Sequence, residues 1–275
     1  MPRRIALTLP ANQAQVASVY VRRALPRRAL RRVGPFVFCD HFGPAPSAMD
    51  VPPHPHVGLQ TVTYLFSGTI EHTDSLGSIQ KILPGDVNWM TAGARIVHAE
   101  RALPDSGTLH GIQTWVALPH AARAGAPAFA HFDSAALPVL ERPGVRARVI
   151  AGSAAGLISP VPTFSPLTYV DVALEAGGEI VLAMDATREL AIYVAEGEVL
   201  VGRDGVAVGS LAKLDEGDDA VVLSSPNGAR AIVIGGAPMP EPTVIWWNFV
   251  VDSVEQGRSL EAAWAAGEFP KLAWS

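Results

Sequence analysis

The chain contains 275 residues, of which 26 are acidic and 21 are basic, and its formal net charge at pH 7 is −5. This length accommodates one large domain or two of ordinary size, with an ample hydrophobic core. The single cysteine excludes an intramolecular disulfide bond. No apolar run approaches the roughly 18 residues that cross a bilayer, and no secretory signal is evident. We therefore expect a cytoplasmic protein without a membrane-spanning segment.

The N-terminal segment is strongly basic. Residues 1–32 contain eight arginines and no acidic residue, so all the acidic residues lie beyond it. A basic arm of this kind is typical of nucleic-acid contact. The arginines are nevertheless interleaved with apolar residues, as a strand and a turn would be. We favour internal pairing with the acidic remainder over direct nucleic-acid binding, which depends mainly on phosphate contacts.

Two pairs of polar side chains stand two residues apart, His54 with His56 and His98 with Glu100. Side chains at i and i+2 of a β-strand point to the same face, about 6.6 Å apart along the strand. The first pair alone is explained equally well by surface histidines or by hydrogen-bonded core histidines. Residues 85–93 before the second pair read as a turn, a short buried strand and another turn. Two neighbouring strands would then direct three imidazoles and one carboxylate to one point, which predicts a metal site.

A weak internal repeat divides the chain. Residues 64–70 correspond to residues 193–199, and each copy is followed by a Gly-Asp turn into a further strand. The segment between the copies, residues 120–145, is rich in alanine and proline. We therefore expect two β-barrels or sandwiches, with an N-terminal metal-binding domain over residues 1–125 and a metal-free domain over residues 126–275.

The β pattern ends near the C-terminus, where a helix is expected. Ser253 begins a capping-box spacing, although Gly257 interrupts it. Ser259 precedes a better helical run over residues 260–266, which Gly267 ends. The apolar residues of this run share one face, so we expect the helix to pack on a barrel.

Many segments together resemble the pirin family of the cupin superfamily. The resemblance is carried by residues 33–38, 40–43, 54–56, 61–65, 72–77, 84–87, 89–93, 98–100, 110–116 and 246–250. It implies an all-β bicupin, with two stacked cupin (jelly-roll-like) β-barrels and a short C-terminal helix. In pirins the positions matching His54, His56, His98 and Glu100 bind iron, and the resemblance implies the same four ligands here.

The predicted ligand set leaves the choice of metal open. Four protein ligands would close a tetrahedral zinc site, whereas an octahedral ion would keep two open positions. Imidazole and carboxylate suit iron, manganese, nickel, copper, cobalt and zinc, and the resemblance favours Fe(II). Residues 132–275 contain neither histidine nor cysteine. We therefore expect one transition metal ion per chain.

Two functions of different classes follow from the resemblance. The first is a quercetin 2,3-dioxygenase type of enzyme, in which dioxygen reacts with an aromatic flavonol-like substrate that chelates the metal. Glu100 would then serve both as ligand and as catalytic base. The second is a non-enzymatic regulatory protein that binds a transcription factor or a metabolic enzyme according to its metal or redox state. Neither the substrate nor the protein partner is specified by the sequence.

Several further residues are candidates for the pocket around the metal. Gln113 could hydrogen-bond a ligand and fix its orientation, while Phe42 and Met90 could line an apolar pocket or belong to the core. Arg95 could project near the metal entrance, because this chain lacks the glycine that many pirins have in that turn. His72 falls in a polar hairpin turn and is expected to be solvated.

Overall fold

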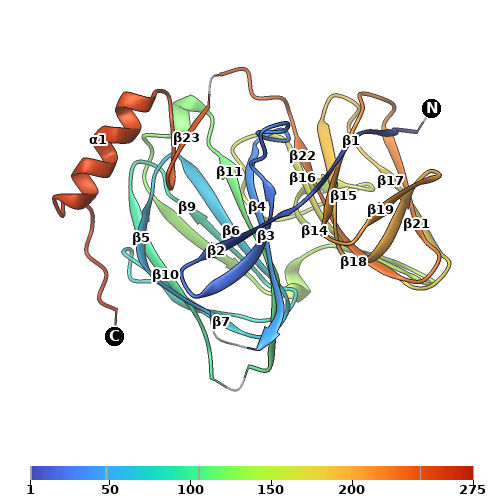
Figure 1. Cartoon of the computed structure of the whole chain (residues 1–275), viewed down its shortest axis with the longest axis horizontal. Coiled ribbons are helices and arrows are strands. Elements are labelled where there is room, and N and C mark those ends of the chain that lie inside the picture. The colour runs from blue at the N-terminus through green and yellow to red at the C-terminus, as the bar shows by residue number, and fades with distance from the viewer. Residues whose placement is uncertain (1, 47–48, 105, 242, 275) are drawn as a thin grey trace. The chain divides into compact units, whose positions relative to one another are not determined.

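Most of the regular structure of the chain is β-strand, and one α-helix follows near the C-terminus (Figure 1). The structure is a computed structural model that describes residues 2–46, 49–104, 106–241 and 243–274. The expected all-β class with a short C-terminal helix is confirmed. No helix in these described ranges has the length and apolar character needed to cross a membrane.

Two compact units are assembled from segments that alternate along the chain. One unit comprises residues 1–12, 22–36 and 135–238, and the other comprises residues 13–21, 37–134 and 239–275. Each unit is compact but is made of several separate segments, so the units do not correspond to two consecutive domains. The division expected between residues 125 and 126 therefore stays a prediction.

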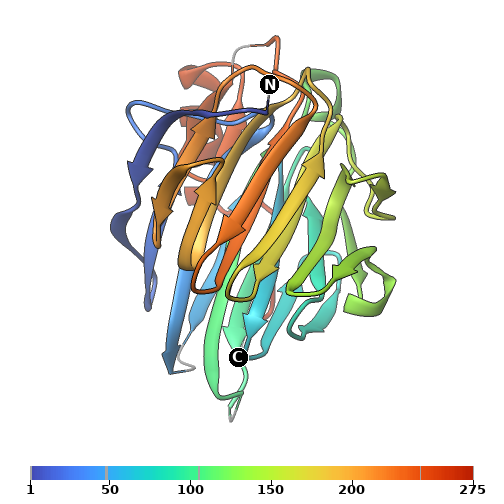
Figure 2. The ribbon, with the colours of Figure 1, turned by 90° about the vertical axis from the view of Figure 1, so that its right-hand side faces the viewer.

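The first unit is built on an eleven-stranded sheet whose main path runs β1-β20-β18-β22-β16-β14-β13. Figure 2 looks onto β22, β16 and β14, which lie side by side. Its strands are β1 (Ile5–Pro10), β13 (Val139–Arg142), β14 (Val145–Ala154), β15 (Leu157–Ile158), β16 (Leu167–Leu174), β17 (Gly178–Ala183), β18 (Glu189–Val201), β19 (Asp204–Ala207), β20 (Ser210–Leu214), β21 (Ala220–Ser225) and β22 (Ala229–Gly236).

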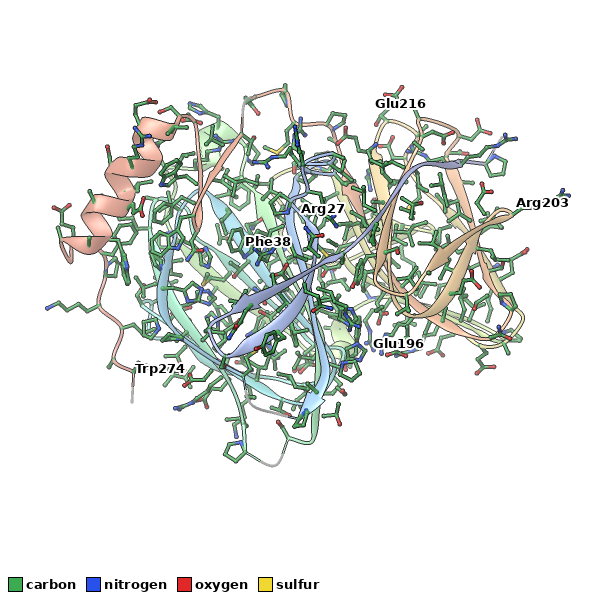
Figure 3. All side chains as sticks on the ribbon, in the orientation of Figure 1. Arg27, Phe38, Glu196, Arg203, Glu216 and Trp274 are labelled. Atoms are coloured by element: carbon green, nitrogen blue, oxygen red, sulfur yellow. The ribbon has the colours of Figure 1, made fainter. Side chains whose placement is uncertain are left out.

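The core of this unit follows from the period-two pattern of its strands. In β17 buried and exposed residues alternate strictly, and Ile180 and Leu182 enter the core. β16 and β22 place Val170 opposite Val233, where β-branched side chains pack well on a pleated surface. Side chains fill the interior, while Arg203 points outward from the turn between β18 and β19 (Figure 3).

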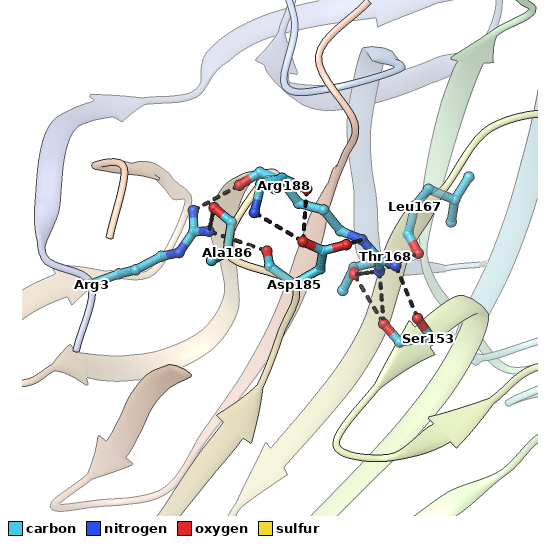
Figure 4. Close-up of polar contacts among 8 residues, drawn as sticks. Arg3, Ser153, Leu167, Thr168, Asp185, Ala186 and Arg188 are labelled. Carbon is cyan, nitrogen blue, oxygen red and sulfur yellow. Dashed lines mark hydrogen bonds and ion pairs between the residues drawn. The ribbon is translucent and has the colours of Figure 1, made fainter. Parts of the chain in front are cut away.

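Arg3 fastens the N-terminal segment to this unit. Its guanidinium donates hydrogen bonds to the carbonyl oxygens of residues 185, 186, 188, 215 and 218, at 2.7–3.4 Å. Arg188, beside it, donates to Ser153 and Thr168 (Figure 4). Arg3 is buried, so at least this arginine of the basic N-terminal segment belongs to the folded structure. Its direct partners are main-chain carbonyls, although the sequence suggested acidic side chains.

Three further sheets consist mainly of residues of the second unit and are ordered β12-β9-β6-β11-β4-β3-β2, β5-β10-β7-β8 and β23-β24. The elements of these sheets and the remaining helical turns are β2 (Asn12–Val16), β3 (Val19–Leu25), β4 (Phe36–Pro46), β5 (Asp50–His56), β6 (Leu59–Ser67), β7 (Ile70–Asp74), β8 (Ile79–Ile82), β9 (Val87–Thr91), β10 (Ile96–Ala102), β11 (Thr108–Ala117), β12 (Ala128–Phe132), β23 (Val244–Trp246), β24 (Phe249–Val251), α1 (Val254–Ala265), and the 3-10 turns η1 (His120–Ala122) and η2 (Ser134–Ala136).

The helix α1 begins earlier than the sequence pattern indicated. Ser253 is its N-cap and accepts a hydrogen bond from the Gln256 backbone, so the first capping box is the real start. Gly257, expected to interrupt the helix, lies inside it and is buried against Trp246. An added Cβ there would overlap the indole, so the helix needs a glycine at this contact. Apolar residues of the expected run, Leu260 among them, do pack on the core of this unit as predicted.

Candidate metal centre

The two histidine-containing pairs lie on neighbouring strands of the second unit. β5 and β10 are antiparallel, and His98 lies directly opposite His54 in their register. His56 follows two residues after His54 and therefore shares its face of the strand. The ring centroids of the three histidines are 4.4, 4.9 and 5.0 Å apart. One nitrogen atom of each ring lies within 4.8 Å of the corresponding atoms of the other two.

Backbone carbonyls fix the orientation of the two β5 histidines. His54 Nδ1 lies 2.9 Å from the Pro52 carbonyl oxygen, and His56 Nδ1 lies 3.0 Å from that of Asn248. A carbonyl oxygen can only accept, so each Nδ1 carries the proton. Each Nε2 therefore keeps a free lone pair, which is the form of imidazole that binds a metal ion.

The third histidine has an unsatisfied nitrogen. His98 is buried, and within the described residues its Nε2 atom has no hydrogen-bond partner. Its other nitrogen, Nδ1, lies 3.4 Å from Nδ1 of His72. An orphaned buried nitrogen is costly unless something binds it, and a metal ion at Nε2 would meet that requirement.

Glu100 enters the site beside His98 through an irregularity in the strand pairing. The register of β5 and β10 shifts between His98 and Glu100. One Glu100 carboxylate oxygen, one His72 nitrogen and one His98 nitrogen all lie within 4.8 Å of one another. The hydroxyl of Thr63 donates to Glu100 Oε1 at 2.6 Å and thereby holds the carboxylate. His98 is thus shared by a group of three histidines and a second group that contains Glu100.

Burial shapes the electrostatics of these histidines. Desolvation lowers the pKa of His54, and it lowers the pKa values of His56 and His98 well below the usual range. These three rings are therefore neutral at neutral pH, as metal ligands must be. Burial also opposes protonation of His72, but hydrogen bonds to Asp74 and Glu100 outweigh it and raise the pKa of that histidine.

A cavity of about 70 Å³ connects the four predicted ligands. The rest of its wall is mostly apolar. The lining residues are Val16, Val19, Val21, Phe38, Asp40, Phe42, Met49, Val51, His54, His56, His98, Glu100, Gln113 and Trp115. The predicted ligands could hold a metal in this cavity, while the apolar part of the wall could contact an apolar ligand.

The sequence of this chain matches two family models in order. Residues 18–116 match the pirin model, and residues 169–270 match the model of the pirin C-terminal cupin domain. The chain belongs to the pirin family. This confirms the resemblance seen in the sequence motifs, and with it the expectation of two cupin domains.

Pirins and solved structures are similar to this chain over nearly its whole length. A pirin-like protein of Caulobacter vibrioides is 41% identical, with 96% of this chain and 94% of that protein covered. Human pirin is 33% identical, with 90% and 87% covered. The crystal structure of a quercetin 2,3-dioxygenase from Acinetobacter baumannii has a TM-score of 0.91 and 34% identity, with 97% of this chain and 91% of that chain covered.

Of the four further pocket candidates in this pirin, two line the cavity and two lie elsewhere. Phe42 and Gln113 are lining residues. Met90 instead packs in the core with neighbours that include Phe129, because β9 is buried on both faces and burial alone does not select the cavity side. Arg95 donates to the Glu268 carbonyl, and its guanidinium lies over the Phe269 ring. This long-range contact with the C-terminal segment has no signal in the local sequence.

His72 is buried in this pirin, and its expected solvation is wrong. It lies on β7, where residues 70, 72 and 74 are buried and the residues between them are only partly buried. The apolar residue Ile70 marks the inward face of that strand, so the period of two could have placed His72 inside. Thr63 was missed as well, because a threonine in an apolar strand gives no sign of the carboxylate that it holds.

Proposed function

We propose that this pirin binds one transition metal ion through His54, His56, His98 and Glu100. The observation that carries the proposal is the close approach of three imidazole nitrogens. His54 and His56 direct Nδ1 at backbone carbonyls, which leaves Nε2 available, and Nε2 of His98 has no hydrogen-bond partner among the described residues. Neutral buried nitrogens and one carboxylate suit a divalent first-row ion. We favour Fe(II) on family grounds, while manganese, nickel, copper, cobalt and zinc fit the same donors.

We further propose that the reaction is dioxygenation of a flavonol-like substrate. The solved relative named quercetin 2,3-dioxygenase supports this reaction class. The metal would supply Lewis acidity and, for iron, redox chemistry with dioxygen. Glu100 would accept the proton of the substrate hydroxyl, and Thr63 would hold the carboxylate in place for that transfer. Phe42 and other apolar wall residues would contact a flat ring.

The size of the cavity supports a second candidate function. Drug-sized ligands occupy pockets of roughly 300–1,000 Å³, whereas this cavity has about 70 Å³. A flavonol could enter only if wall residues such as Val16 and Val19 moved outward. A site that stays closed would suit a regulatory protein, in which the metal acts on a protein partner without turnover.

Metal content is the first test. Purified protein should contain about one equivalent of a transition metal, because the predicted ligand set makes one site. His56→Ala and His98→Ala should each lose it, whereas His120→Ala, a change at an exposed residue, should retain it. Metal content that both ligand changes leave unaltered would refute the assignment.

Oxygen uptake is the second test, and Glu100→Gln is its decisive variant. Protein loaded with iron, manganese, nickel or copper should consume oxygen with quercetin. Glu100→Gln should keep part of the metal and slow turnover by roughly 10²–10⁴-fold, because an amide cannot accept the substrate proton. If every loaded form leaves quercetin intact, the dioxygenase proposal fails for flavonols and the regulatory function takes its place.

A further inference from the structure

Three buried side chains form a line that begins at His98, which lines the cavity, and continues to two residues outside the cavity lining. Asp74 Oδ2 lies 3.2 Å from His72 Nε2, and His72 Nδ1 lies 3.4 Å from His98 Nδ1. All three residues are only 1% exposed. Asp74 and His72 are the register partners of His98 and Glu100 across β7 and β10, so the strand pairing itself builds this line.

Only one arrangement of protons suits this line when His98 Nε2 binds a metal. Nδ1 of His98 must then carry the ring proton, and the nearest acceptor is Nδ1 of His72. His72 accepts this proton only in its neutral form, with its own proton on Nε2 and directed at the Asp74 carboxylate. A cation held by His98 and Glu100 would favour this neutral form over the protonated form that the carboxylates of Asp74 and Glu100 favour in the metal-free protein. Asp74 is fixed for this task, because its other oxygen accepts from the backbone N–H groups of Leu76 and Ser78.

The ring of His72 is also held by packing. Phe129 of β12 stacks on it, with a centroid separation of 4.5 Å and an interplanar angle of 16°. His72 can neither turn toward solvent nor exchange its partners freely. The ring of His72 thus has a stacking contact on its face and a polar contact at each nitrogen. These contacts fix its orientation more firmly than apolar packing alone would.

We propose that His72, oriented by Asp74, is a positioning residue for the metal ligand His98. It accepts the Nδ1 proton of His98 and so keeps the Nε2 lone pair of that ligand directed into the cavity. Partners of metal-bound histidines often contribute 10–100-fold to metal affinity. This inference rests on the proposed metal binding at His98, and it assigns a role to a residue outside the predicted ligand set.

The test is the affinity of the full-length protein for Co²⁺, measured by competition with a chelator. His72→Phe keeps a ring against Phe129 but removes the acceptor, and it should raise the Co²⁺ Kd about 10–100-fold. His72→Asn keeps an acceptor oxygen near the Nδ1 position and should recover most of this loss. His131→Phe, which replaces another histidine of the same unit, should leave the Kd unchanged.

A spectroscopic measurement separates positioning from packing. In zinc-loaded protein with labelled histidine, the Nδ1 proton of His98 should give a slowly exchanging NMR signal that His72→Phe abolishes. Wild-type affinity in His72→Phe would overturn the inference. So would an equal loss in His72→Asn and His72→Phe at unchanged melting temperature. A wild-type protein that binds no metal would refute the proposed function itself, and this role with it.

If His72→Phe does not fold, Asp74→Asn decides the matter. This variant keeps the shape of the side chain but removes the charge that orients His72. It should weaken Co²⁺ binding by roughly 10-fold. Unchanged Co²⁺ affinity in Asp74→Asn would also overturn the inference.

Discussion

Four histidines lie close together in this pirin, three of them buried and His54 partly buried, and their surroundings affect the protonated imidazolium form differently. His54, His56 and His98 lose solvation without gaining an adequate anionic partner, so their pKa values are lowered. His72 also loses solvation, but the carboxylates of Asp74 and Glu100 raise its pKa. The three predicted ligands are thereby kept neutral.

This difference predicts how pH affects the stability of the metal-free protein. Groups with lowered folded pKa values contribute full stability above the unfolded value of about 6.5 and lose it as the pH falls. His72 has a raised pKa and acts in the opposite sense, but three groups outweigh one. We expect the free energy of unfolding, measured with denaturant and a chelator, to fall by roughly 1–3 kcal/mol per pH unit below 6.5.

The control for this experiment is a histidine at the surface. His120 is exposed, and His120→Gln should show the same loss on acidification as the wild type. A stability that is constant or greater at pH 5.5 than at pH 7.5 would contradict the electrostatic argument.

At the scale of elements, the turn that follows β5 requires a glycine. Gly58 lies two residues after His56, has a φ of +71°, and would overlap the Val250 carbonyl oxygen if it carried a Cβ. Gly77 has a φ of +90° but open space around it. The two positions therefore share a left-handed backbone and differ in steric contact.

Gly58→Ala should consequently be much more damaging than Gly77→Ala. The left-handed conformation costs an alanine about 1–2 kcal/mol at either position, and the overlap at Gly58 adds to this. We expect Gly58→Ala to lower the free energy of unfolding by at least about 2 kcal/mol more and to reduce metal retention, because His56 would shift. Equal costs in denaturant unfolding would show that the Val250 contact is easily relieved.

The strands and the ligand pairs were largely predictable because both depend on a local period of two. His54 and His98 were brought together as the spacing predicted, and the strand character of their segments needed no distant information. Arg95 was misplaced because its partner is a carbonyl more than 170 residues away. The early start of α1 was misjudged for a related reason, since the tolerance of Gly257 depends on its contact with Trp246.

At the scale of the whole molecule, Arg3 adds a set of side-chain hydrogen bonds to the ladder that β1 forms with β20. Arg3 donates to carbonyls that lie 182 to 215 residues later in the sequence. These carbonyls would remain buried without their donor if the guanidinium were removed. Arg3 therefore contributes to stability beyond the strand pairing of this segment.

We expect Arg3→Ala and Arg3→Lys both to lower the free energy of unfolding, by roughly 2–4 kcal/mol, because an ammonium group cannot reach the same set of carbonyls. Arg203→Ala, at an exposed turn, is the matched control and should change stability by less than about 0.5 kcal/mol.

Deletion of residues 1–32 should likewise lower the melting temperature without altering DNA affinity. A truncated protein of full stability that had lost tight DNA binding would favour the nucleic-acid interpretation instead.

The hydrogen bond from His56 to the Asn248 carbonyl can form only some time after His56 has been synthesised. The two residues are 192 positions apart, and ribosomes add about 5–20 residues per second, so roughly 10–40 s separate their synthesis. During that interval His56 has no carbonyl to fix its tautomer. The proposed ligand His56 can therefore acquire this orienting contact only after Asn248 has left the ribosome. Under the proposed metal binding, an ion that arrives before that moment would meet an imidazole whose tautomer is not yet fixed.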